Sequence, residues 1–136
     1  MATENIDRKA MLAAGKLLKN SAVQANRSIV ENLATKGLGV VLEQGLYAGL
    51  LFFYSRPDRE RSIANLFATM LLLLTKELVP PPEKSGVDWN NRLSTLGYIA
   101  TDVTKNLQQT IWVKTVWEQT LTYVRYGAKA LEKAGD

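Results

Sequence analysis

Apolar residues recur along the first part of the chain at steps of three and four, the period of one face of an α-helix. This spacing predicts a helical block from about residue 4 to residue 35, which Thr3 can cap and Asn20-Ser21 can interrupt. Gly37 and Gly39 are expected to end the block, because glycine readily takes the left-handed conformation at a helix C-terminus. The predicted inward face consists of Met11, Ala14, Leu18, Ala22, Ala25, Ile29 and Leu33.

The next segment, Val40–Tyr54, is apolar almost all round, and Glu43 and Gln44 are its strongly polar positions. A helix without a wide polar face is expected to lie in the middle of a bundle or to be covered by a partner. Gly45 and Gly49 are four residues apart and share one face of the predicted helix. We interpret them as the place where another helix approaches closely, in preference to a contact between the backbone and a ligand.

A third helix is predicted from Asp58, which can cap it, to Val79, which precedes three consecutive prolines. Residues 80–86 then form an exposed loop. Asp88 is the expected N-cap of the last block, residues 88–134, which should hold two helices with a break near residues 105–109. The final helix carries a heptad-like apolar seam made of Trp117, Leu121, Val124, Ala128 and Leu131.

Strand signals, by contrast, do not occur: no run alternates between apolar and polar residues around a hairpin turn. A length of 136 residues suits one domain and is enough to bury a core without a disulfide or a metal. The sequence therefore predicts an all-α fold, a single-domain bundle of five or six helices over residues 1–136.

Composition removes several classes of enzyme. The chain has no cysteine and no histidine, so it lacks thiol nucleophiles, the commonest general base and the commonest metal ligands. Glu43, Glu77, Asp102 and Glu118 fall on predicted helices, but no DxD, ExxH or glycine-rich phosphate loop accompanies them. We expect a protein without enzymatic activity, without catalytic residues, and without a cofactor, a metal or a small-molecule substrate.

The compartment is inferred from what the sequence lacks. The N-terminus is polar and has no apolar signal region. The most apolar stretch, Ile63–Leu74, contains Asn65 and Thr69 and is shorter than the roughly 20 residues of a membrane span. We expect a cytoplasmic protein with no membrane partner.

Charge points to a phosphate-bearing partner. The net charge is +4, and no acid occurs between Arg8 and Arg27. In an unbroken helix the five basic residues of this segment fall within an arc of about 100°, a stripe that can follow a nucleic-acid backbone. A solvated face is the alternative, and Leu12, Val23 and Val30 in the same arc would suit contact with a protein. The predicted RNA-binding residues of this stripe are Arg8, Lys9, Lys16, Lys19 and Arg27.

The last helix offers a second basic face beside an aromatic flank. Arg125 and Lys129 are further candidates for RNA contact, with Lys114 and Lys133 on the same side of the seam. Aromatic side chains can stack on bases, but they are equally suited to protein interfaces, and we favour the interface. The aromatic residues concerned are Trp112, Tyr123 and Tyr126.

A long predicted N-terminal helix and two passages that follow it carry a family resemblance. Residues 37–56, GLGVVLEQGLYAGLLFFYSR, and residues 113–131, VKTVWEQTLTYVRYGAKAL, resemble the small α-helical subunit of type III-B CRISPR RNA-guided effector complexes, the Cmr-type small subunit. Gly45-Leu46 and Arg56 match the family's glycine–leucine pair and the basic residue that ends its apolar helix. Lys36-Gly37 stands where family members often have a proline. The small subunit of type III-A complexes is a near alternative with the same role.

This resemblance implies a non-catalytic subunit that stacks with copies of itself and with other effector subunits in antiviral defence. It would contact the backbone of guide RNA and target RNA, while base pairing supplies specificity. The alternatives are a stand-alone helical module for protein–protein interaction and a peripheral membrane protein with a basic amphipathic helix.

Overall fold

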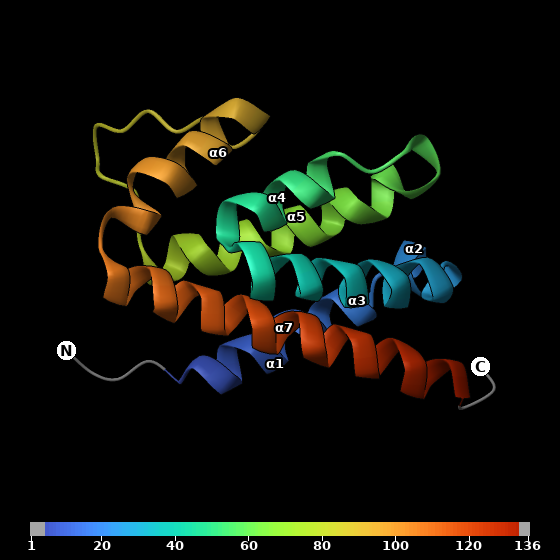
Figure 1. Cartoon of the computed structure of the whole chain (residues 1–136). Helices are drawn as coiled ribbons and strands as arrows, with labels where there is room; N and C mark the ends of the chain where they lie inside the picture. Colours follow the sequence, from blue (N-terminus) through green and yellow to red (C-terminus); the bar gives the residue numbers. More distant parts are fainter. Residues whose placement is uncertain (1–4, 134–136) are drawn as a thin grey trace.

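The computed structural model describes residues 5–133, and over this range the chain is all-α (Figure 1). The all-α prediction is therefore confirmed, although the described part holds seven α-helices where five or six were expected. The extra helices arise because the first two predicted blocks are divided differently. The elements are α1 (Ile6–Leu18), α2 (Ser21–Ala25), α3 (Arg27–Gln44), α4 (Leu46–Tyr54), α5 (Asp58–Leu78), α6 (Arg92–Thr101), a short 3-10 helix (Val103–Lys105) and α7 (Leu107–Lys133).

The interruption predicted at Asn20-Ser21 is confirmed. Asn20 Oδ1 accepts hydrogen bonds of 2.8 Å and 3.3 Å from the amides of Ala22 and Val23, so its side chain begins α2. A second break follows at Asn26, whose backbone leaves the helical region before α3. The expected cap Thr3 lies outside the described residues, and Asn5 caps α1 by accepting a bond of 2.9 Å from the Arg8 amide.

The prediction that Gly37 and Gly39 end a helix is wrong, because α3 continues through both to Gln44. Gly37 is needed for packing instead of for a turn. A Cβ atom at Gly37 would lie 2.4 Å from Cζ of Phe53, a residue of the following helix. The absence of a side chain on α3 therefore makes room for the Phe53 ring on α4.

The prediction for Gly45 and Gly49 is half right. A Cβ atom on Gly49 would lie 2.6 Å from Val41 Cγ2 and 3.6 Å from Trp117 Cζ3, so this glycine does permit a close approach. Gly45 lies instead at the junction between α3 and α4, with a φ of 94° and no atom within 4 Å of its Cβ position. That backbone conformation is almost restricted to glycine, and it turns the chain between two helices that were expected to be one.

Two aspartates expected as helix caps have other roles. Pro57 holds the N-cap position of α5, and Asp58 in its first turn forms an ion pair of 2.9 Å with Arg61. Asn91 caps α6, while the Asp88 carboxylate accepts a bond of 3.0 Å from the Asn90 amide. The break expected near residues 105–109 is confirmed, since the 3-10 helix ends at Lys105 and α7 begins at Leu107.

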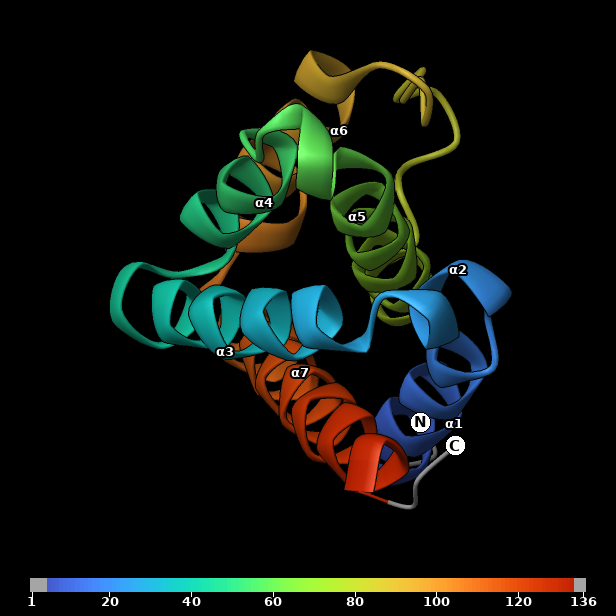
Figure 2. The same ribbon diagram turned by 90° about the vertical axis from the view of Figure 1, so that its right-hand side faces the viewer.

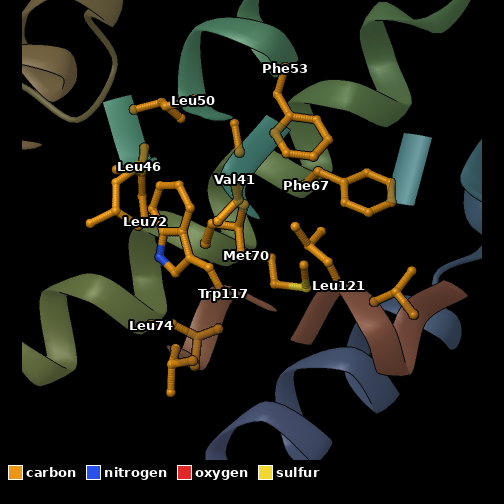
Figure 3. Close-up of a cluster of buried hydrophobic side chains, with 14 of the residues drawn as sticks. Val41, Leu46, Leu50, Phe53, Phe67, Met70, Leu72, Leu74, Trp117 and Leu121 are labelled. Carbon is orange, nitrogen blue, oxygen red and sulfur yellow. The ribbon is translucent and has the colours of Figure 1, made fainter. Parts of the chain in front are cut away.

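The long helix α7 lies against α3 and α1, as both ribbon views show, and supplies the centre of the core (Figures 1 and 2). Trp117 is fully buried among side chains of α3, α4 and α5, near the stacked rings of Phe53 and Phe67, whose centroids are 5.1 Å apart (Figure 3). The predicted seam of α7 is buried except for Leu131, which is 37% exposed. The buried apolar side chains form one continuous cluster, so every helix is anchored to the same core.

Candidate nucleic-acid interface

Four of the five residues of the predicted basic stripe remain together on α1. Arg8, Lys9, Lys16 and its C-cap Lys19 fall within an arc of about 100° around the helix axis. Arg8, Lys16 and Lys19 are exposed. Leu12 lies in the middle of the same arc and is 58% exposed, so the stripe combines positive charge with an uncovered apolar side chain.

Lys9 is the member of the stripe that turns toward a neighbouring helix. Its Nζ atom lies 3.0 Å from Oε1 of Glu77 on α5, and its side chain is 24% exposed. This ion pair bridges α1 and α5 near the surface, where such a pair contributes little to stability. It also places one negative charge beside the cations of α1.

Arg27 does not share this face, because the two breaks at Asn20 and Asn26 separate it from α1. Its Nη1 atom donates a hydrogen bond of 3.0 Å to the carbonyl oxygen of Leu131 in the last turn of α7. A cation at a helix C-terminus satisfies a carbonyl that lacks a partner within the helix. Arg27 thus joins the start of α3 to the end of α7.

The apolar members of the predicted arc also separate. Val23 and Val30 are buried in the core at 1% and 0% exposure, whereas Leu12 stays outside it. Leu12, Val23 and Val30 would share one arc only in an unbroken helix, and the breaks at Asn20 and Asn26 separate them. On the folded chain, the positive surface of this region is a property of α1 alone.

Arg125 and Lys129 belong to a different face of the molecule. Gly127, between them in the sequence, faces α1, because a Cβ atom there would lie 2.4 Å from Leu18 Cδ1. At about 100° per residue, both basic residues project about 160° away from Gly127 around α7. The structure therefore divides the predicted RNA-binding residues into a group on α1, Arg27 at the start of α3 and a pair on the far side of α7. The side chain of Lys133 lies outside the described part.

The three aromatic residues predicted as an interface differ in exposure. Trp112 and Tyr123 are partly buried against the core of their own chain, and Tyr126 is 59% exposed. The Tyr123 hydroxyl donates to Oδ1 of Asp7 on α1, and this hydrogen bond raises the pKa of the phenol. The Arg125 guanidinium lies 5.4 Å from the Tyr126 ring centroid, so a partly buried cation accompanies the exposed ring of this flank.

A groove of about 590 Å³ is lined by residues of α1 and α5. Figure 2 shows these two helices on the right of the molecule. Arg8, Lys9 and Lys16 line one side of it, and Glu77 lies opposite. Its apolar lining includes Leu12, Leu17, Leu66, Met70, Leu73 and Leu74.

Sequence reasoning missed the α5 side of this groove. The spacing of Leu66, Met70 and Leu74 predicts core positions on one face of this helix, and Leu73 widens the same predicted inward face. Leu73 is 50% exposed in the folded chain, beside the cations of α1. The run of four leucines from residue 71 to residue 74 was the available signal, because such a run places leucines all round a helix and one must face outward.

Within residues 5–133, no group of three or more potential metal-ligating side chains occurs. Glu118 lies 3.9 Å from Lys114 on its own helix, and Glu77 pairs with Lys9. The same part of the chain contains no helix that combines the length and the apolar character needed to cross a membrane.

Comparison of the chain with models of protein families, with curated proteins and with solved structures gave no match.

Proposed function

We propose that this chain is a non-catalytic, RNA-binding small subunit of an RNA-guided effector complex of the CRISPR type III class. In this role, copies of the chain stack beside other effector subunits in the cytoplasm, and the cations of α1 contact the backbone of the guide–target RNA duplex. Cleavage belongs to other subunits, and base pairing determines the sequence that is recognised.

The observation that carries the RNA-binding part is the clustering of Arg8, Lys9, Lys16 and Lys19 on one side of a single helix. The first and last of these residues are about 16 Å apart along the helix axis. This distance spans several phosphates of one strand, so the side chains can follow a backbone without reading bases. The resemblance of residues 37–56 and 113–131 to the Cmr-type small subunit supports membership in the complex.

The binding test uses the full chain and two triple variants with equal loss of charge. The first variant changes Arg8, Lys16 and Lys19 to alanine. The control changes the exposed residues Lys36, Lys84 and Lys105, which lie on other elements, to alanine.

We expect the α1 variant to bind duplex RNA more weakly and to lose about one unit of the log-affinity against log-salt slope for each phosphate contact that is removed. The control should keep a slope close to that of the wild type. Equal losses in the two variants would show that net charge alone governs binding, and the assignment to α1 would be abandoned.

Membership in an effector complex is tested separately. The gene should lie among genes for other effector subunits, beside a repeat array, and the tagged chain should copurify with those subunits and a guide RNA. An unrelated operon and an absence of guide RNA would contradict the proposal even if the isolated chain bound RNA.

A further inference from the structure

The groove between α1 and α5 has the form of a two-helix platform. On α5 it is lined at positions 66, 70, 73 and 77, the i, i+4, i+7, i+11 spacing of one helix face, over about 16 Å. On the other side, the lining follows the whole of α1, whose 13 residues span about 20 Å. Two faces of this length lying side by side form the groove into which a third helix of about four turns packs.

The floor of the groove holds apolar surface that the chain itself does not cover. Leu12 is 58% exposed and Leu73 is 50% exposed, and they come from the two opposite sides. Leu66 beside them is partly buried. Exposed leucines from two helices that converge on one groove mark a surface suited to an apolar partner.

The charges around the groove are unbalanced. Among the residues that the structure describes, its lining carries three cations, Arg8, Lys9 and Lys16, and one anion, Glu77. Since Lys9 pairs with Glu77 at 3.0 Å, the positive excess is concentrated at Arg8 and Lys16, on either side of Leu12. A complementary partner therefore presents apolar side chains flanked by carboxylates.

We propose that this groove binds an acidic amphipathic α-helix of a protein partner. Leucine-like side chains of the partner at i, i+4, i+7 and i+11 contact the floor, and its carboxylates pair with Arg8 and Lys16. Over residues 5–133, the lining contains no aromatic ring on which a nucleic-acid base could stack. Leu12 and Leu73 are half-exposed, so the groove is open to solvent where they lie, which suits the side of a helix better than a single enclosed acyl chain.

This inference does not depend on the proposed RNA-binding function, although it involves the same helix. RNA phosphates need only the cations of α1, whereas the helical partner also needs Leu12 and Leu73. RNA and the helical partner should therefore compete for Arg8 and Lys16. Substitution of Leu12 and Leu73 should lower the affinity for the helical partner and leave the affinity for RNA unchanged.

The test uses the full chain and a fluorescent peptide of about four helical turns, with leucines on one face and glutamates at the flanking positions. We expect binding that the double variant Leu12→Gln, Leu73→Gln weakens by at least about tenfold, because the two leucines supply the apolar contact. Glutamine has a helix propensity similar to that of leucine, and an unchanged circular dichroism spectrum and melting temperature confirm folding. The matched control is Leu93→Gln, Leu107→Gln, which changes two leucines that are 79% and 75% exposed on other helices and should bind normally.

A peptide with lysine in place of every glutamate should bind at least about tenfold more weakly, because it would meet Arg8 and Lys16 with like charge. The double groove variant should keep the salt slope of RNA binding, so loss of peptide binding leaves the RNA proposal intact. The inference is overturned if the groove variant binds the acidic peptide as well as the control does. It is also overturned if the lysine peptide binds equally well, or if oleate or anionic vesicles occupy the groove while the peptide does not.

Discussion

Nε1 of Trp117 donates a hydrogen bond of 2.8 Å to Oγ1 of Thr75, and this bond joins α7 to α5 inside the core. Both residues are fully buried. The Thr75 hydroxyl in turn donates to the Leu71 carbonyl at 2.7 Å. The hydroxyl therefore accepts from the buried indole and has an acceptor for its own hydrogen. The largest side chain of the core is thereby fixed in orientation as well as packed.

Replacing Thr75 by valine should lower the free energy of unfolding by about 1–3 kcal/mol, because the indole donor stays buried without an acceptor. The measurement is urea denaturation of the full chain. Thr120→Val is the matched control, since Thr120 is also fully buried and its hydroxyl donates only within its own helix, to Val116. A loss at Thr75 no larger than the loss at Thr120 would show that the Trp117 bond adds no stability.

Gly49→Ala should destabilise the fold by about 1–3 kcal/mol through overpacking, because its Cβ atom would meet Val41 at 2.6 Å. Gly39→Ala, where the Cβ position is open, should instead stabilise α3 by up to about 1 kcal/mol through its better helix propensity. Melting curves of both variants check the pair. The same sign for both changes would contradict the packing role assigned to Gly49.

Gly45→Ala should also destabilise the fold, by about 1–3 kcal/mol, but through the backbone, because the φ of 94° strains an L-residue while the Cβ position is open. D-Alanine introduced at this position by semisynthesis should restore the melting temperature, since the mirror image of this conformation lies in the broad β region. If D-alanine is as harmful as L-alanine, the cause is steric and not conformational.

Stability should fall in alkali because of Tyr98. Burial, together with the negative charge of Asp102, raises the pKa of this phenol in the folded state. The folded state therefore holds the Tyr98 proton to a higher pH than the unfolded chain, whose tyrosines ionise near pH 10. The stabilisation is complete below about pH 10 and is lost above it, with a slope of up to about 1.4 kcal/mol per pH unit.

Urea denaturation between pH 9 and pH 11 measures this slope. Tyr98→Phe should flatten it, and Tyr47→Phe, which removes an exposed phenol on α4, should leave it unchanged. An identical slope in wild type and Tyr98→Phe would assign the alkaline loss to other groups.

Glu77→Gln should raise the affinity for RNA and make its salt dependence steeper, because it removes the anion that faces the cations of α1 across the groove. Glu83→Gln, an equal change of charge in the exposed loop after α5, is the control. If both changes raise the affinity to the same extent, the effect comes from net charge and not from the groove.

Features that depend on neighbours in the sequence were predictable. Asn20 interrupts a helix because its side chain competes for the amides two and three residues ahead, and that preference is visible in the sequence alone. The seam from Trp117 to Ala128 follows from helical spacing and is buried as expected.

Features that depend on distant contacts were not predictable. In the sequence, Gly37 has the features of a residue that ends a helix. Its role in packing depends on the Phe53 ring, which lies against it only in the folded chain. In an unbroken helix Arg27 would share an arc with Lys16. The breaks at Asn20 and Asn26 place it beside the Leu131 carbonyl instead. The groove depends on the separation between α1 and α5, which no local pattern encodes.

The packing of α1 on α7 has a consequence for the order of folding. The bond from Tyr123 to Asp7 joins residues 116 positions apart. Helical bundles usually fold rapidly through contacts between near neighbours, but this bond closes a loop almost as long as the chain, and its entropic cost comes before any contact energy. The docking of α1 is therefore expected late on the pathway, and α1 should be the first helix to exchange its amide hydrogens through partial opening, because it can leave while α3, α4, α5 and α7 still share their core.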